Sequence, residues 1–374
     1  GRVPLILSSA IPLKEVKQNN RKEVFDFIVK ELQESAPLLA QTYSNRSGSY
    51  YGRITRPVVH FLLAKLVLNA EIYADDNWTD TQYPDGRDIY FEVDGNRLNA
   101  WQTVEAYCDS ITAAGYRLED NYEANFAVYN ESSAENIFTI PMSKTLYTNQ
   151  MQYLFRSRHY NHAKAYGLGG ENGSSATVEV LRTFGYDTQT VDPRFDKCYF
   201  AGVVYDLKGK VITLDDGTLL EYFPWKVDVD ISNTSYEKTA GARMKKYEID
   251  ETATKDGKLM ENDIVLYRYA DVLLMKSEAK VRNGENGDVE LNLVRARVNA
   301  PFRTATLESL LSERQLEFAW EGWRRQDLVR FRQYTRAYTS RPRLPGEESG
   351  YTTVFPIPEK IRLMNPNLTQ NPGY

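Results

Sequence analysis

Apolar side chains recur at helical spacing in the first third of the chain. Those within residues 21–39 fall on one face of a predicted helix, and Asn20 stands where it can cap the first turn. Residues 57–73 and 100–114 predict two further helices, the second of which ends at Gly115. A long polar loop joins these two helices, so we expect a helix hairpin that must bury its apolar faces against other helices.

The middle third changes from helical to strand-like spacing. The segment ENIFTIP (residues 135–141) is a short apolar strand candidate, and residues 146–175 form a loop rich in aromatic and basic side chains and then in glycine. Alternating apolar and polar positions return over residues 199–250, with turn signals at residues 208–209 and 215–217. This part predicts a loop-rich insert with some β structure.

Helical spacing returns strongly over residues 267–300. These 34 residues predict a helix, a Gly/Asn turn and a second helix, with the small residues Ala270, Ser277 and Ala279 on the first helix. The length and the small residues match a tetratricopeptide (TPR) unit, in which small side chains let paired helices approach closely. The predicted fold is therefore mainly α: TPR-like helix pairs form a scaffold with long irregular loops and a small β-containing insert.

The same patterns divide the chain into three predicted parts. Residues 1–130 form an N-terminal helical part, residues 131–250 form the insert and carry the candidate ligand surface, and residues 251–374 hold TPR-like helix pairs and a tail. The last twenty residues contain four prolines and three asparagines, which fix backbone angles and close local turns. We expect this tail to dock as a strap across the helical body, because its apolar side chains fit a disordered tail poorly.

The densest charged segment covers residues 312–331. Glu313, Glu317 and Glu321 lie four residues apart on one face of a predicted helix, with arginines beside them. A glycoside hydrolase uses a pair of carboxylates, but a neighbouring arginine lowers a carboxylate pKa, whereas a general acid needs its pKa raised. A salt-bridged structural helix pair is therefore the favoured interpretation, and a glycoside hydrolase is the less favoured alternative.

Charge and motifs exclude several other classes of protein. A net charge of −5 argues against nucleic acid as a partner, since phosphate binding needs a basic surface. No apolar run reaches membrane-spanning length, and the sequence lacks nucleophile-elbow, phosphate-loop and metal-ligand motifs. We therefore expect no catalytic residue, no cofactor and no metal. Cys108 and Cys198 are compatible with a disulfide or with two buried thiols.

Aromatic side chains are the most abundant candidate chemistry. The chain has 26 tyrosines, and many of them lie in predicted loops. Flat rings can stack on the C–H faces of sugars, while Arg, Asn, Gln and His side chains pair with sugar hydroxyls. Residues 147–166 supply both kinds of side chain, so this cluster is predicted to bind a ligand, although any single tyrosine is more often packed against the protein body.

Three motifs in the C-terminal half resemble those of one family. They are VLYRYADVLLMKSEA, ERQLEFAWEGWRRQDLVRF and the closing FPIP…NPNLTQNPGY, which are similar to signatures of the SusD/RagB family of outer-membrane glycan-binding lipoproteins. NRKEVFDFIVKELQESAPLL, SAENIFTI and VDPRF resemble weaker signatures of the family in the same order. The resemblance therefore covers essentially the whole chain.

The resemblance implies a function and a location. Family members act as lids on a SusC-like TonB-dependent transporter, where they capture oligosaccharides or, in the RagB branch, peptides, without catalysis or a cofactor. A lipidated N-terminal cysteine anchors them at the outer surface of a Gram-negative outer membrane. The GRVPLI segment resembles a motif that normally follows an N-terminal helical region, so the anchor and part of the binding surface are expected to lie outside this chain.

The resemblance also places the candidate site. In family members, the loop after the strand that corresponds to ENIFTI often lends aromatic rings to the ligand surface. This implies Tyr147, Tyr153, Tyr160 and Tyr166 as stacking candidates. The further candidates are Arg158 and His162 as partners for hydroxyls, with Trp78, Tyr83 and Trp225 as weaker choices for stacking.

Overall fold

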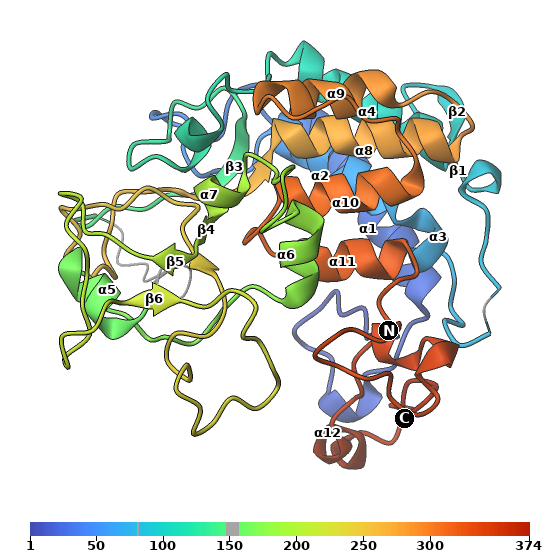
Figure 1. Cartoon of the computed structure of the whole chain (residues 1–374). Coiled ribbons are helices and arrows are strands. Elements are labelled where there is room, and N and C mark those ends of the chain that lie inside the picture. Colours follow the sequence, from blue (N-terminus) through green and yellow to red (C-terminus); the bar gives the residue numbers. More distant parts are fainter. Residues whose placement is uncertain (81, 147–156) are drawn as a thin grey trace.

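The computed structural model describes residues 1–80, 82–146 and 157–374, and its helices stack beside a loop-rich part (Figure 1). The α-helices are α1 (Arg21–Ser35), α2 (Arg56–Leu68), α3 (Ala70–Tyr73), α4 (Ala100–Ala113), α5 (Tyr160–Ala165), α6 (Val178–Phe184), α7 (Phe195–Cys198), α8 (Tyr269–Arg282), α9 (Asp288–Arg297), α10 (Leu307–Glu317), α11 (Arg324–Arg330) and α12 (Glu359–Met364). The strands are β1 (Tyr90–Val93), β2 (Asn96–Asn99), β3 (Asn136–Ile140), β4 (Tyr199–Phe200), β5 (Gly202–Val203), β6 (Glu221–Tyr222), β7 (Arg243–Met244) and β8 (Ile264–Arg268).

The helices on either side of the insert share one hydrophobic core. α2 packs against α4, and both pack against α8, with Phe61, Trp101 and Leu274 buried between them. Because α2 and α4 precede the insert and α8 follows it, the helical segments on either side of the insert fold into one unit. The prediction of a mainly α scaffold with a small β-containing insert is confirmed.

The predicted helix pair over residues 267–300 is α8 followed by α9, which lie side by side in Figure 1. The small residues allow the close approach that their spacing predicts. The hydroxyl of Ser277 donates to the carbonyl of Gly287 at 2.7 Å. A Cβ atom on Gly287 would lie 2.6 Å from the Ser277 carbonyl oxygen, so a larger residue at Gly287 would force the two helices apart.

One predicted helix ends earlier than its apolar pattern suggests, and another is interrupted. α1 has the expected Asn20 cap but stops at Ser35, because Pro37 follows in a 3₁₀ turn and lacks an N–H for a further helical hydrogen bond. The second helix breaks at Asn69, whose side chain donates to the carbonyl of Lys65 at 2.8 Å, and α3 resumes after it.

One element was missed in the loop between α3 and α4. β1 and β2 form an antiparallel hairpin there, with Asp94 and Gly95 at its turn. Both turn residues have positive φ angles, 51° and 79°, as a tight hairpin turn requires. The Asp-Gly pair was the signal for this hairpin, since it favours a two-residue turn with positive φ angles at both positions.

Three short antiparallel ladders lie within the insert and where it meets the helices. The predicted strand ENIFTIP is β3, and it pairs antiparallel with β8, which leads directly into α8. Inside the insert, β4 pairs with β7 and β5 pairs with β6, each over only two residues. A second apolar cluster includes Phe126, Phe195 and Met244, the last of these on β7. The insert is therefore held more by loops and side chains than by sheet.

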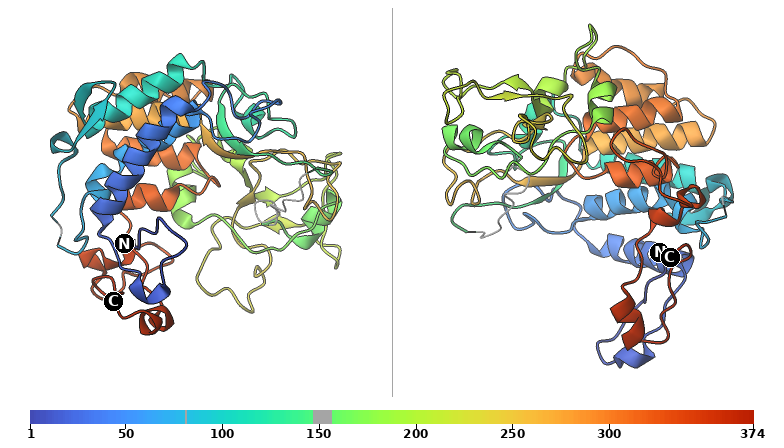
Figure 2. Two further views of the ribbon diagram at one scale, coloured as in Figure 1. Left: turned by 180° about the vertical axis from the view of Figure 1, so that it is seen from behind. Right: turned by 60° about the horizontal axis from the view of Figure 1, so that its bottom comes forward.

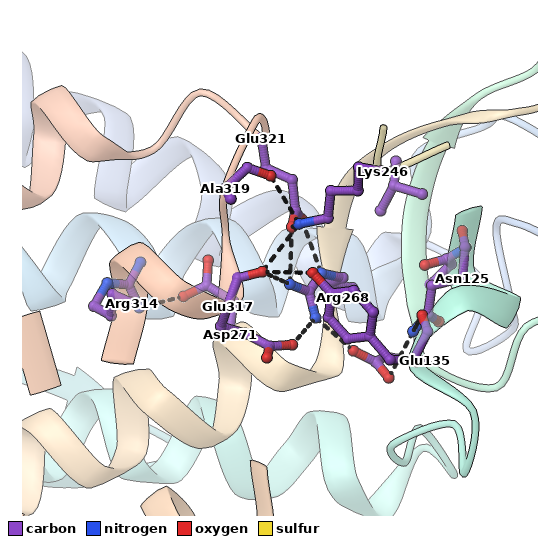
Figure 3. Close-up of polar contacts among 12 residues, drawn as sticks. Asn125, Glu135, Lys246, Arg268, Asp271, Arg314, Glu317, Ala319 and Glu321 are labelled. Atoms are coloured by element: carbon purple, nitrogen blue, oxygen red, sulfur yellow. Dashed lines mark hydrogen bonds and ion pairs between the residues drawn. The ribbon is translucent and has the colours of Figure 1, made fainter. Parts of the chain in front are cut away.

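A buried ion network joins the insert to the helices (Figure 3). Arg268, at the end of β8, contacts Glu317 of α10 at 2.5 Å and Glu135 at 2.8 Å. Arg194 binds Glu317 at 2.8 Å from the insert side, and Arg297 of α9 also contacts it. Burial alone would raise the pKa of Glu317, but Arg297, Arg268 and Arg194 outweigh it and hold that pKa well below its usual range.

The salt-bridged helix pair predicted over residues 312–331 is confirmed as α10 and α11, with one correction. Glu321 does not lie on the helix of Glu313 and Glu317, because α10 ends at Glu317 and the chain turns through Trp320 and Gly322, whose φ angles are 66° and 82°. Glu321 still reaches Arg268, at 2.8 Å.

The two ends of the chain form a projecting lobe (Figure 2). Asn365 donates to the carbonyls of Leu13 and Val16, each at 2.9 Å, and the N–H of Thr369 donates to Gln18 at 2.8 Å. The tail therefore docks, but on residues 1–20 rather than across the helical body. Its apolar side chains are not the reason, since Leu363 is 79% exposed, and asparagine hydrogen bonds to the main chain fix it instead.

The remaining structural expectations concern the cysteines and the membrane. Cys108 and Cys198 are free and buried, and they belong to different apolar clusters. Of the two possibilities that their spacing left open, the structure contains two buried thiols. Within the described residues, no helix combines the length and the apolar character needed to cross a membrane.

Candidate functional site

The candidate cluster after β3 is built around the phenol of Tyr222 on β6. The N–H of His159 donates to this oxygen at 2.8 Å, and Nδ1 of His162 lies 3.0 Å from it. Burial, with the nearby charge of Arg158, lowers the pKa of His162 to about 3, so its imidazole is neutral at physiological pH. The neutral Nδ1 can then accept the phenol hydrogen, and both ends of this contact hold α5 onto the insert.

Three of the predicted site residues meet inside this cluster. The guanidinium of Arg158 lies 6.0 Å from the ring centre of Tyr166, and the ring of His162 lies 5.0 Å from the same ring. Arg158 is 1% exposed and His162 is fully buried. These two side chains therefore lie out of reach of a ligand at the surface. They pack near the Tyr166 ring, whereas the sequence predicted that they would contact the hydroxyls of a ligand.

A hollow of about 570 Å³ opens beside this cluster. Tyr166 and Phe200 form part of its wall, and Lys197 and Lys245 stand among its polar lining. The hydroxyl of Tyr166 donates to the carbonyl of Tyr205 at 2.8 Å, which fixes the ring at the edge of the hollow. The hollow thus combines aromatic surface with cationic side chains in a space large enough for a small ligand.

Two predicted rings stand free at the surface of the insert. Tyr160, at the first turn of α5, is 52% exposed, and Trp225, which follows β6, is 42% exposed. The indole N–H of Trp225 donates to the carboxylate of Asp187 at 2.6 Å, and the ring of Tyr186 lies 6.0 Å from the Trp225 ring, so the partly exposed ring is held in place. A ring fixed in advance loses little conformational entropy when it stacks on a ligand.

Trp78 and Tyr83 lie elsewhere, on the helical side of the molecule. Both line a smaller hollow of about 130 Å³. Trp78 is 3% exposed and lies under the guanidinium of Arg21, which is 4.9 Å from its ring centre. Arg332 covers Tyr83 at 3.5 Å. Arginines thus occupy the ring surface that a sugar would need. Tyr147 and Tyr153 lie outside the described residues.

The sequence missed several residues around the hollow that Tyr166 lines. Phe200 and Lys245 come from strand-like segments far from residues 147–166, and they meet only because β4 pairs with β7. Their proximity needs the fold, since no local spacing connects them. The alternation over residues 199–250 was a signal for strands but not for their register.

The structure offers no acid–base pair in the charged helices. Glu313 and Glu317 are fully buried, and both contact Arg194. A general acid must hold a proton near neutral pH, whereas the arginines around Glu317 keep it ionised. Among the residues that the structure describes, no group of three or more His, Cys, Asp or Glu side chains could hold a metal ion.

Comparison with known proteins adds a family to this geometry. A profile of the SusD family matches residues 134–374, which include the insert, the ion network and the tail. The chain belongs to the SusD family. This agrees with the resemblance of its C-terminal motifs.

SusD-family relatives cover nearly all of this chain. It is 30% identical over 392 aligned residues to the starch-binding protein SusD of Bacteroides thetaiotaomicron, which covers 94% of this chain and 65% of SusD. Surface glycan-binding protein A from Bacteroides uniformis has a similar structure, with a TM-score of 0.67 and 19% identity over 99% of this chain and 73% of that one. Surface glycan-binding protein A from Bacteroides thetaiotaomicron, in complex with laminarihexaose, has a TM-score of 0.65 and 21% identity. The match covers 95% of this chain and 72% of that one. These likenesses show the SusD-like fold, and the chain spans 65% of the curated relative's length.

Proposed function

We propose that this chain is part of a cell-surface glycan-binding protein that delivers oligosaccharides to a SusC-like TonB-dependent transporter. Its full-length form would be lipid-anchored on the outer face of the outer membrane. The observation that carries the proposal is the pair of open rings, Tyr160 and Trp225, on the insert that also holds the hollow lined by Tyr166. Relatives named for binding starch and laminarihexaose support a saccharide ligand.

Binding without catalysis follows from the chemistry of these groups. Aromatic faces and lysines can hold a sugar by stacking and by hydrogen bonds, but neither group cleaves a glycosidic bond without a proton donor. Glu317 of the ion network cannot supply that proton, because it is buried and the arginines around it hold its pKa well below its usual range. The ligand therefore leaves this surface chemically unchanged.

Calorimetric titration with oligosaccharides of starch and of laminarin tests the proposal. We expect at least one to bind, and Tyr160→Ala and Trp225→Ala each to weaken binding by about tenfold, as loss of a central ring commonly does. Tyr90→Ala is the matched control, because Tyr90 is 48% exposed on the β1–β2 hairpin of the helical half. Equal affinity in all three variants would overturn the assignment of the surface.

Two further outcomes separate the neighbouring alternatives. A blank saccharide panel with peptide binding that Tyr160→Ala abolishes would place the protein with the RagB-like, peptide-binding branch. Release of reducing ends from a polysaccharide by the wild-type protein would contradict the proposal and favour a glycoside hydrolase. Loss of that release in a Glu317→Gln variant that is still folded would assign the activity to Glu317. Co-purification of the full-length protein with a transporter from outer membranes tests the proposed partner, and its absence would contradict that part of the proposal.

A further inference from the structure

A second large hollow, of about 680 Å³, lies on the helical half of the molecule. It is bounded by α6, by α10 and by the turn that follows α11, which stand together in Figure 1. We call it the arginine hollow, since its charged lining consists of Arg282, Arg324, Arg330, Arg332 and Arg336 against Glu71, Glu179 and Glu308. Arginine outnumbers carboxylate here, although the whole chain carries a net charge of −5.

Three of these arginines have carboxylate partners. Arg282 and Arg330 both bind Glu278, at 2.9 Å and 2.8 Å, and Arg332 reaches Glu71 at 3.5 Å. Their charges are thus balanced within the protein.

Arg324 and Arg336 have no carboxylate partner among the described residues. Nη1 of Arg324 donates to the carbonyl of Leu311 at 2.8 Å, and Nη1 of Arg336 donates to the amide oxygen of Gln333 at 3.3 Å. The other guanidinium hydrogens of both arginines are left for a partner from outside. Two uncompensated guanidinium groups therefore share one open space.

The surrounding charges do not neutralise Arg324. Burial lowers the pKa of Arg324 to about 10, and the nearby charge of Arg336 acts in the same direction. Asp327 opposes this shift, but its carboxylate already accepts from Arg314 and Arg330, each at 2.8 Å. A partly buried cation in this state gains most from an anion that it can bind with two parallel hydrogen bonds.

Besides Glu71, the carboxylates that line the hollow are Glu179 and Glu308. Glu179 accepts the N–H of Thr339 at 2.7 Å and forms no ion pair among the described residues. Glu308 lies exposed in the first turn of α10. Neither carboxylate therefore pairs with Arg324 or Arg336, so both guanidinium groups are without a carboxylate partner among the described residues.

We propose that the arginine hollow binds an oxyanion, the carboxylate or sulfate group of an acidic ligand, between Arg324 and Arg336. Ser312 and Gln315 of α10 line the same space and offer polar hydrogens to the rest of the ligand. This site is separate from the surface around Tyr160 and does not rest on the proposed function.

Titration at low ionic strength with inorganic sulfate, glucuronate and glucose tests this site. We expect sulfate or glucuronate to bind and glucose not to bind. Arg324→Gln and Arg336→Gln should each weaken anion binding at least tenfold, while Arg97→Gln, an exposed arginine on β2, should leave it unchanged. Because Arg336 is exposed, its variant tests the site even if Arg324→Gln impairs folding.

The outcomes separate the sources of the anion and the two proposals. Equal affinity for sulfate and glucuronate shows that the oxyanion alone is recognised, and tighter binding of glucuronate shows that the sugar ring is recognised as well. Absence of anion binding, or identical affinities in Arg336→Gln and Arg97→Gln, would overturn the proposal. Binding of a neutral oligosaccharide should be the same in these variants, so failure of either proposal is visible without the other.

Discussion

The ion network around Arg268 and the surface around Tyr160 differ in what completes their side chains. In the network, Arg268 and Glu317 are buried, and each is matched by partners from other parts of the chain. On the insert surface, the side chains of Tyr160 and Trp225 are partly exposed. The charged groups of the network find their partners within the protein, whereas the exposed rings can take a ligand as their partner.

This difference teaches where to look for function in such a chain. The charged helix segments looked most like an active centre in the sequence, yet they hold the insert onto the scaffold. The proposed binding surface lies on segments with short strands and irregular loops, where the sequence pattern is weakest. Dense charge in an apolar setting marks a structural network when each ion has its partner.

The largest expected effect comes from breaking the network. Glu317→Gln leaves Arg268, Arg297 and Arg194 without their shared carboxylate, and removal of one member of a buried ion pair typically costs about 3–5 kcal/mol. Urea unfolding measures this loss. Glu308→Gln, an exposed glutamate on the same helix, should change the free energy of unfolding by less than about 0.5 kcal/mol. Equal losses in the two variants would contradict the difference between the regions.

The next largest effect is expected from acid, which should weaken the buried ion pairs of Glu278 with Arg330 and Arg282. Burial alone would raise the pKa of Glu278, but Arg330 and Arg282 outweigh it and lower that pKa to about 2. Because the unfolded value is about 4.3, this carboxylate stabilises the fold fully above that pH, and the stabilisation is lost as the pH falls through 2. The contribution is about 3 kcal/mol. The free energy of unfolding should be measured from pH 5 to pH 2 for wild type and for Glu278→Gln. It should fall less steeply with pH in the variant, and parallel curves would contradict the role of the Glu278 carboxylate.

A smaller effect is expected at the point where α5 is fixed to the insert. Tyr222→Phe removes the buried phenol that His159 and His162 share, which should cost about 1–3 kcal/mol. Tyr205→Phe is the control, since Tyr205 is 51% exposed and only its carbonyl takes part in the cluster. Thermal unfolding of both variants decides the matter: indistinguishable midpoints would show that the phenol does not anchor α5.

The sequence predicted the scaffold well because its signals are local. The Asn20 cap, the period of α2 and α4, and the small Ser277 opposite Gly287 each act within a few turns of a helix. Boundaries were less certain where a polar side chain interrupts the pattern, as at Asn69. The docking of the tail on residues 1–20 depends on contacts across nearly the whole chain, which no local pattern contains.

The candidate site could be located only approximately. Composition found the aromatic cluster, but an aromatic ring looks the same in sequence whether it stacks inward, like Tyr166, or stands free, like Tyr160. The burial of Arg158 and His162 follows from how α5 sits on β6, and this packing joins segments about sixty residues apart. Strand register and ion partners decide such cases, and both are properties of the folded chain.

The central claim is best tested by measuring stability and saccharide binding on the same variant, Tyr160→Ala. Tyr160 is half exposed, and its ring lies 5.6 Å from the neighbouring ring of His159. We therefore expect the free energy of unfolding to change by less than about 0.5 kcal/mol, while calorimetry shows affinity for the bound oligosaccharide about tenfold weaker. Unchanged affinity in a normally folded Tyr160→Ala would contradict the account.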